Sequence, residues 1–244
     1  EINRSAGKKS TKIDVETFAL LNYAKVCYEQ SEGFFDITSG VLRNLWSAET
    51  IQLPSQKDLD EHLQKIGFSM MEFNDEEVFL PVTGMELDFG GIVKEYAADA
   101  LVTTARRRGI SFGLINLGGD IAIIGPQADG APWLFGITHP VIKGRTIATI
   151  PLSSGSLTTS GGYERFVEIK GERYSHLMNP KTGIPFKSIL SASVIADQAI
   201  VAGSITSIAL LNEELDSLEW LEKCDVPYLA IKKNLECIGS LAGN

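Results

Sequence analysis

The stretch VKEYAADALVTTARRRGISFGLINLGGDIAIIG, residues 93–125, decides the fold class. Its first half is predicted to be a helix that ends at an arginine run and Gly109, because cations and glycine favour helix C-termini. Its second half is predicted to form two β-strands broken by Gly118 and Gly119. A helix that leads into a pair of strands is typical of an α+β fold.

The flanking sequence extends this pattern. A helix at 55–67 is predicted to begin after Ser55 and to end at Gly67. Further helices are predicted at 15–30, 197–211 and 213–223. Strands are predicted as a pair within 71–91 and singly at 132–138, 146–151, 156–160, 163–169, 191–196 and 226–232. Because strands occur both as hairpins and between helices, we expect an α+β fold with packed helices, in one domain over residues 1–244.

Composition excludes some classes of function. The 244 residues carry a formal net charge of −9, which argues against non-specific nucleic-acid binding. The chain has no run of eighteen apolar residues, so we expect no transmembrane segment. The three cysteines lack metal-ligand spacing. An acidic protein that handles phosphates must gather its cations, or a metal ion, at one place.

Polar and glycine-rich clusters stand in the predicted loops, where functional sites are usually built. Lys94 lies near the start of a predicted helix, a position that the helix dipole disfavours for a cation. A bound anion at that helix N-terminus would explain it, and a solvated lysine is the alternative. The clusters are GFFDITSG (33–40), ELDFGGIVKEYAAD (86–99), NLGGDI (116–121) and TTSGGYERF (158–166).

Among the histidines, His176 is the candidate for chemistry. It stands in RYSHLMNPKTGIP (173–185), where Asn-Pro and Lys-Thr-Gly are turn sequences that would hold the imidazole on rigid backbone. Histidine has an unperturbed pKa of about 6.5 and is the usual proton carrier at neutral pH. A purely structural histidine is the alternative. His62 is expected on a solvated helix face, and His139 is assigned no role.

Taken together, the motifs resemble the ApbE family of flavin transferases. The matching segments are, in order, FDIT (35–38), LDFGGIVKEYAAD (87–99), NLGGDI (116–121), SGGYER (160–165), SHLMNPKTGIP (175–185) and VAGSITSIALL (201–211). The resemblance implies a T-fold-related domain with a mixed, largely antiparallel sheet. Family members usually have a further βαβ-like stretch before the point that corresponds to residue 1.

The resemblance also implies an activity. Family enzymes transfer the FMN half of FAD to a threonine or serine hydroxyl of a target flavoprotein, release AMP and require Mg²⁺. The alternatives are a catalytically impaired FAD-binding domain and an FAD pyrophosphatase that yields FMN and AMP. The acceptor would be a subunit of a membrane redox complex, and the location would be the bacterial periplasm or the inner membrane.

By the same resemblance, residues of the motifs take roles. His176 would be catalytic and would assist deprotonation of the incoming hydroxyl. The carbonyl of Gly91 and the hydroxyl of Ser207 would be metal ligands. The FAD-binding residues would be Phe34, Phe35, Asp36, Asp88, Lys94, Asp120, Ser160 and Leu177.

The sequence departs from the family at acidic positions. Gly203 stands where an aspartate usually binds the metal, Asn179 and Gly162 also replace aspartates, and Ser207 replaces a threonine. Glycine cannot supply a carboxylate ligand. Three explanations are open: the diphosphate and Gly91 hold the metal, Asp197 reaches in from the helix start, or metal-dependent chemistry is lost and the domain only binds flavin.

Overall fold

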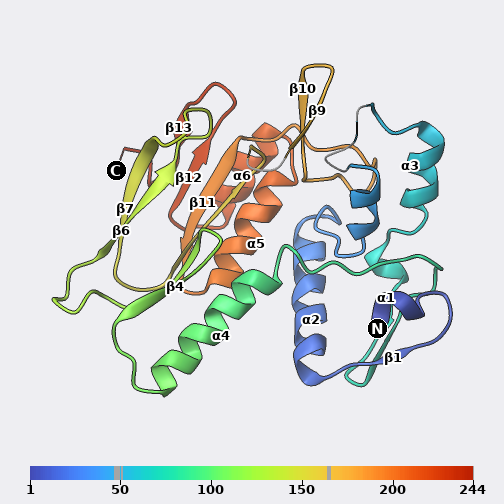
Figure 1. The fold of residues 1–244 in the computed structure, drawn as a ribbon, viewed down its shortest axis with the longest axis horizontal. Helices are drawn as coiled ribbons and strands as arrows, with labels where there is room; N and C mark the ends of the chain where they lie inside the picture. The colour runs from blue at the N-terminus through green and yellow to red at the C-terminus, as the bar shows by residue number, and fades with distance from the viewer. Residues whose placement is uncertain (47–49, 51, 164–165, 244) are drawn as a thin grey trace. The chain divides into compact units, whose positions relative to one another are not determined.

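The computed structural model describes residues 1–46, 50, 52–163 and 166–243. The chain forms two compact units, which Figure 1 shows as a ribbon. Unit 1 consists of Glu1–Phe89 and Arg165–Phe186, and unit 2 of Gly90–Glu164 and Lys187–Asn244. The single domain over residues 1–244 stays a prediction, and each unit is described by itself.

Unit 2 is built on a six-stranded sheet in which every neighbouring pair is antiparallel. The strand order is β13-β12-β11-β8-β5-β4. The expectation of a largely antiparallel sheet is confirmed, and the two strands predicted on either side of Gly118 and Gly119 pair as a hairpin at the edge of the sheet. The strands are β4 (Gly113–Leu117), β5 (Asp120–Gly125), β8 (Ser156–Gly161), β11 (Ser191–Ala196), β12 (Tyr228–Ile231) and β13 (Cys237–Ile238).

The two faces of the sheet carry different partners because side chains alternate along a strand. Ile121 and Ile123 of β5 join a buried cluster with Ile150 from the hairpin of β6 (Trp133–Thr138) and β7 (Thr146–Leu152). Ala122, between them in sequence, joins a second cluster under α4 (Val93–Arg107) and α5 (Ala199–Leu210). The helices therefore pack on the face opposite to the β6–β7 hairpin.

Helix α5 is buried along almost its whole length, and α6 (Glu214–Lys223) follows it. Its N-terminus is capped from α4, because Asp99 accepts hydrogen bonds from the backbone N–H groups of Ala199 (2.8 Å) and Ile200 (2.9 Å). An aspartate that accepts such bonds stabilises a helix start. Asp99 thus fixes the register of α5 against α4.

Unit 1 is assembled from short elements around one long helix, α2 (Val15–Gln30), whose N-cap Asp14 accepts a hydrogen bond from Thr17 N at 2.8 Å. The others are α1 (Ile2–Ser5), β1 (Thr11–Lys12), the 3₁₀ helices η1 (Gly40–Asn44) and η2 (Phe68–Met70), α3 (Gln56–Leu63), β2 (Glu72–Phe73), β3 (Glu77–Phe79), β9 (Phe166–Ile169) and β10 (Glu172–Ser175).

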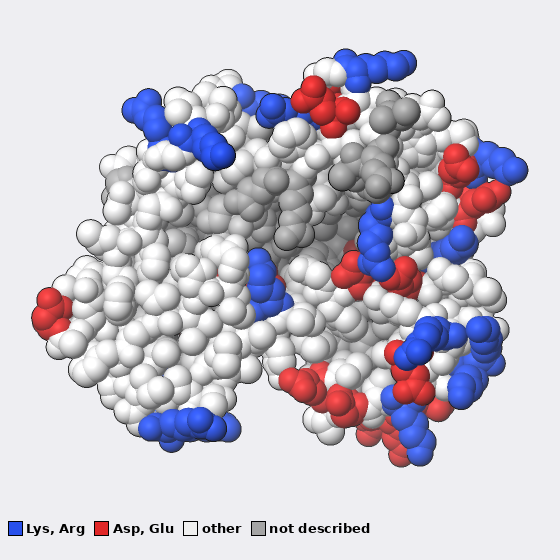
Figure 2. Space-filling view, in the orientation of Figure 1, with Lys and Arg blue, Asp and Glu red and all other residues white. Residues whose placement is uncertain are grey.

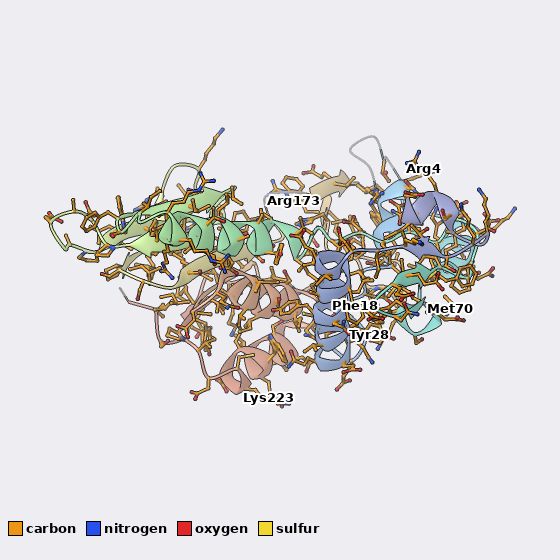
Figure 3. All side chains as sticks on the ribbon, turned by 90° about the horizontal axis from the view of Figure 1, so that it is seen from below. Arg4, Phe18, Tyr28, Met70, Arg173 and Lys223 are labelled. Carbon is orange, nitrogen blue, oxygen red and sulfur yellow. The ribbon has the colours of Figure 1, made fainter. Side chains whose placement is uncertain are left out.

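Aromatic rings join α2 to β2 and to η2. Phe18 meets Phe73 edge-on at 6.2 Å, and Tyr28 stacks on Phe68 at 5.0 Å between ring centroids. Figure 3 shows Phe18 and Tyr28 on α2, on the side toward Met70. Such pairs add stability beyond the apolar area that they bury.

Two predicted elements need correction. The helix expected over 55–67 begins as predicted after Ser55, whose hydroxyl accepts a hydrogen bond from Asp58 N, but it ends at Leu63. The strand expected over 163–169 begins at Phe166, with Tyr163 in a turn and residues 164 and 165 outside the described part of the chain. The sequence interpretation also missed α1, β1 and β13.

No described helix is long and apolar enough to cross a membrane. On the face shown in Figure 2, unit 1 carries acidic and basic side chains side by side, whereas unit 2 shows fewer charged side chains. Two of the acidic side chains of unit 2, Glu95 and Asp120, are buried.

Candidate functional site

In unit 1, the loop of residues 33–40 is organised by the buried carboxylate of Asp36. Its Oδ1 accepts hydrogen bonds from the backbone N–H (2.8 Å) and the hydroxyl (2.6 Å) of Thr38. Its Oδ2 accepts a hydrogen bond from Phe68 N at 3.0 Å. Burial raises the pKa of Asp36, although the hydrogen bonds from Thr38 and Phe68 work against that rise. Both carboxylate oxygens therefore hold the loop in shape.

The Asp36 loop lies beside the segment that carries Asp88. Asp88 N donates a hydrogen bond to Ile37 O at 2.7 Å, and Ser39 forms a parallel bridge with Glu86. Arg43 pairs with Asp88 Oδ2 at 2.8 Å and also with Glu86. The structure thus brings Asp36 and Asp88 into neighbouring segments, with Arg43 as a cation that the sequence interpretation did not single out.

His176 is exposed at the neck of a tight loop formed by residues 177–186. Met178 and Pro185 form an antiparallel bridge across this neck, and Phe186 N donates a hydrogen bond to Leu177 O at 3.0 Å. Within the loop, Asn179 Oδ1 accepts a hydrogen bond from Lys181 N at 2.8 Å. The predicted turn chemistry is confirmed.

This loop contacts the loop that carries Phe34 and Phe35. Phe35 is buried, whereas Phe34 meets Phe186 edge-on at 5.3 Å. Lys181 Nζ lies 4.1 Å from the centre of the Phe34 ring and donates a hydrogen bond to Glu32 O at 2.9 Å. Unit 1 therefore gathers the segments of Phe34–Asp36, Asp88 and His176–Leu177.

In unit 2, the candidate residues meet at the first turn of α4. Lys94 Nζ lies 2.5 Å from Asp120 Oδ2 and 3.6 Å from Glu95 Oε1. Asp120 is 3% exposed, and its Oδ1 accepts a hydrogen bond from Thr159 N at 3.3 Å. Glu95 is 6% exposed, and its Oε2 has no hydrogen-bond partner among the described residues. A cation and two buried carboxylates thus share one place.

The contacts among these groups shift the pKa values of Lys94 and Glu95. Partial burial works to lower the pKa of Lys94, but the hydrogen bond and charge of Asp120, together with Glu95, outweigh it and raise that pKa. Burial, followed by the hydrogen bonding and charge of Asp120, raises the pKa of Glu95 to about 7. Perturbed values of this kind concentrate at functional sites, although structural ion pairs produce them too.

The backbone around these groups carries features that suit an anion. The first turn of α4 follows Gly91 and has no side-chain cap, so N–H groups of that turn lack an intrahelical partner. Gly118 and Gly119 adopt φ values of +63° and +99°, and a Cβ on Gly118 would lie 3.9 Å from Lys94 Cδ. Side-chain-free turns of this type let a phosphate approach a helix N-terminus.

The α5 residues named from the sequence lie in the same unit. Ser160 Oγ and Thr206 Oγ1 are 2.8 Å apart, and Thr206 also donates a hydrogen bond to Gly203 O at 3.0 Å. Ser207, one turn after Gly203, is partly exposed. Asp197 is exposed and precedes the first residue of α5.

Comparison with known proteins places the chain in a family. The family model described as "ApbE family" matches residues 1–230. The chain belongs to the ApbE family. A protein named FAD:protein FMN transferase from Klebsiella pneumoniae (strain 342) is 27% identical over 248 residues, with coverage of 98% of this chain and 76% of that protein. One of the same name from Escherichia coli (strain K12) is 32% identical over 200 residues, or 76% of this chain and 56% of that protein.

Solved structures agree with this assignment. The ApbE protein from Thermotoga maritima superposes with a TM-score of 0.88 at 29% identity, covering 98% of this chain and 80% of that one. The flavin transferase ApbE from Vibrio cholerae has the same fold, with a TM-score of 0.84 at 23% identity and coverage of 96% and 77%. The ApbE-type α+β fold predicted from the motifs is confirmed.

Glu95 is the functional candidate that the sequence interpretation missed. It shares the buried stripe of α4 with Ala98 and Val102, at spacings of three and four residues. A carboxylate on the apolar stripe of an otherwise amphipathic helix was the available signal.

Proposed function

We propose that this protein transfers FMN from FAD to a threonine or serine hydroxyl of a target flavoprotein and releases AMP. One structural observation supports the proposal: Lys94 lies beside Glu95 and Asp120 at the start of α4, which has no side-chain cap. A cation, free helix N–H groups and carboxylates at one place suit a diphosphate accompanied by a divalent cation. Relatives with the name FAD:protein FMN transferase support the same reading.

The reaction is a displacement at phosphorus. The acceptor oxygen forms a bond to the FMN phosphorus, the bond from that phosphorus to the bridging oxygen breaks, and AMP leaves with the bridging oxygen. The hydroxyl proton passes to His176, whose imidazole stands exposed on a rigid loop. Lys94 binds the phosphate oxygens, and its positive charge offsets the charge that develops on the leaving AMP.

Mg²⁺ is part of the proposal and would neutralise charge on the diphosphate. No three His, Cys, Asp or Glu side chains gather as a metal site among the described residues. Mg²⁺ bound with a substrate diphosphate needs only one or two protein carboxylates, because phosphate oxygens and water complete its shell. The buried carboxylate oxygens of unit 2 fit that requirement, with the Gly91 carbonyl and the Ser207 hydroxyl as further oxygen donors.

The acceptor and the location complete the proposal. The acceptor would be a flavoprotein subunit of a membrane redox complex, and transfer would take place in the bacterial periplasm or at the inner membrane. Both parts rest on the resemblance to the family. Fractionation of the native host, followed by detection of covalently bound FMN in each fraction, tests them.

One chromatographic assay separates this function from its alternatives. The protein is incubated with FAD and Mg²⁺, with and without an acceptor protein that bears the target threonine. FMN transfer predicts AMP release coupled to a fluorescent flavin on the acceptor. Free FMN and AMP without acceptor would indicate a pyrophosphatase, and FAD binding without AMP release would indicate a binding domain.

The role of His176 is tested with matched histidine variants. His176→Ala is expected to reduce acceptor labelling by about 10²- to 10⁴-fold, as loss of a general base does, and to leave FAD binding within about twofold of wild type. His62→Ala is the control, because His62 lies on α3 in the same unit and its Nδ1 lies 2.8 Å from Asp58 O of its own helix. Normal labelling by His176→Ala would refute the assigned role.

A further inference from the structure

Glu95 and Gly203 are complementary in shape. A Cβ built on Gly203 would lie 2.6 Å from Cγ, 3.1 Å from Cδ and 3.3 Å from Oε1 of Glu95. The side chain of Glu95 therefore fills the space that a side chain at position 203 would occupy. The carboxylate reaches the surface of α5 from α4.

Filling that space does not require a charge. An apolar side chain of similar length would fill it without the desolvation penalty that a buried carboxylate carries. Glu95 Oε2 is nevertheless buried without a hydrogen-bond partner among the described residues. A buried, unsatisfied carboxylate oxygen calls for an explanation, and a cation that is absent from the structure is one.

Lys94 shows that this place accommodates a positive charge, and Ser207 lies on the same helix as Gly203. Lys94 Nζ lies 2.5 Å from Asp120 Oδ2 and 3.6 Å from Glu95 Oε1. Ser207 stands four residues after Gly203 on α5, and residues at this spacing share one face of a helix. The hydroxyl of Ser207 therefore lies one turn along the helix from the position that Glu95 fills.

We propose that Glu95 is a carboxylate ligand of the divalent cation, presented from α4 into the space left by Gly203. This inference rests on the proposed function for the diphosphate that shares the metal. It differs from all three explanations that the sequence left open, because the carboxylate missing from position 203 is supplied from another helix. The donors are the Glu95 carboxylate and the Ser207 hydroxyl, with Asp120 as a second carboxylate beside them.

The test measures metal binding directly. Mn²⁺ is titrated into the protein, alone and saturated with FAD without acceptor, and the free ion is followed by electron paramagnetic resonance. Glu95→Gln keeps the shape but loses the anion, and it should weaken Mn²⁺ binding by about 10- to 100-fold. FAD affinity without metal should change by less than about twofold. Glu219→Gln, an exposed glutamate on α6, controls for net charge and should bind Mn²⁺ normally.

Moving the carboxylate from position 95 to position 203 provides a second test. Glu95→Ala removes every atom of Glu95 that a Cβ at position 203 would approach most closely. Glu95→Ala alone should lose Mn²⁺ affinity, and adding Gly203→Asp should restore it to within about threefold of wild type. This comparison decides the matter even if Glu95→Gln does not fold.

The results of the Mn²⁺ titration can be distinguished from those of the transferase assay. Unchanged Mn²⁺ affinity in Glu95→Gln, or no Mn²⁺ binding by wild type with FAD, overturns the role of Glu95 whether or not an acceptor is labelled. Mn²⁺ binding that depends on Glu95, with no AMP release and no labelled acceptor, leaves the metal site standing and overturns FMN transfer.

Discussion

The side chain of Glu95 fills the space in which a side chain at position 203 would lie, so only glycine fits at Gly203. A Cβ at position 203 would lie 2.6 Å from Glu95 Cγ, closer than non-bonded carbons approach. Gly203 lies inside α5 and does not adopt a positive φ, so the backbone there would accept any L-residue. The glycine is required by a side chain on another helix, and the two positions should respond to mutation as a pair.

Gly203→Ala should destabilise the protein by about 1–3 kcal/mol, because the new methyl group overpacks a filled space. In an open helix the same substitution would stabilise by about 1 kcal/mol. In a Glu95→Ala background the effect should therefore reverse and become stabilising. Urea unfolding of wild type, both single variants and the double variant measures this coupling. Additive effects would contradict the close approach.

The raised pKa of Glu95, about 7, predicts a pH-dependent stability in the metal-free protein. A carboxyl whose folded-state pKa exceeds its unfolded value of 4.5 is favoured in its protonated form by folding. Stability should therefore be highest below about pH 4.5 as far as this group is concerned, and should fall by about 1–3 kcal/mol as pH rises through 7.

Unfolding in the presence of a chelator, between pH 5 and 8, checks this slope. Glu95→Gln cannot ionise and should lose most of the decline over that range, whereas Glu219→Gln should retain it. An identical pH profile for wild type and Glu95→Gln would show that the carboxyl of residue 95 titrates normally.

Much of the fold followed from local pattern. The helix over 15–30, the helix at the start of the 93–125 stretch and the two strands that flank Gly118 and Gly119 were predicted, because spacing and turn residues act within short segments. The prediction of a helix over 55–67 was wrong at its C-terminal end, where contacts with residues distant in sequence are made. Gly67 N and Phe68 N donate hydrogen bonds to Thr38 Oγ1 and Asp36 Oδ2, which draw the chain out of the helix.

The candidate site was likewise predicted only in part. The motifs named Lys94 and Asp120, and the structure places them 2.5 Å apart. They did not name Glu95, because its importance depends on the space at Gly203, more than one hundred residues away in sequence. The missing aspartate at 203 was visible in the sequence, but the carboxylate that reaches the same place was not.

Asp36 should contribute mainly to stability, because its two oxygens accept three hydrogen bonds from Thr38 and Phe68. In Asp36→Asn, the NH₂ group of the side-chain amide would face at least one of the groups that now donate to Asp36. This variant should lower the free energy of unfolding by about 1–3 kcal/mol. Asp36→Ala, which leaves all three donors unsatisfied, should cost more. Thermal unfolding measures both, with Asp75→Asn, an exposed turn residue of the same unit, as the control.

Asp99 offers a way to disturb α5 without touching the metal-site residues. Its carboxylate caps Ala199 N and Ile200 N, the first N–H groups of the helix that carries Gly203 and Ser207. Asp99→Ala should destabilise by about 1–2 kcal/mol, a typical loss for an N-cap, and Asp99→Asn by less, because one side-chain oxygen still accepts. Urea unfolding gives the two free energies.

The same variants separate helix position from ligand chemistry. If the start of α5 must be fixed for Ser207 to reach the cation, Asp99→Ala should weaken Mn²⁺ binding and Asp99→Asn should restore part of it. If both variants bind Mn²⁺ as tightly as wild type despite lower stability, the cap contributes to folding alone, and Glu95 holds the cation independently of the start of α5.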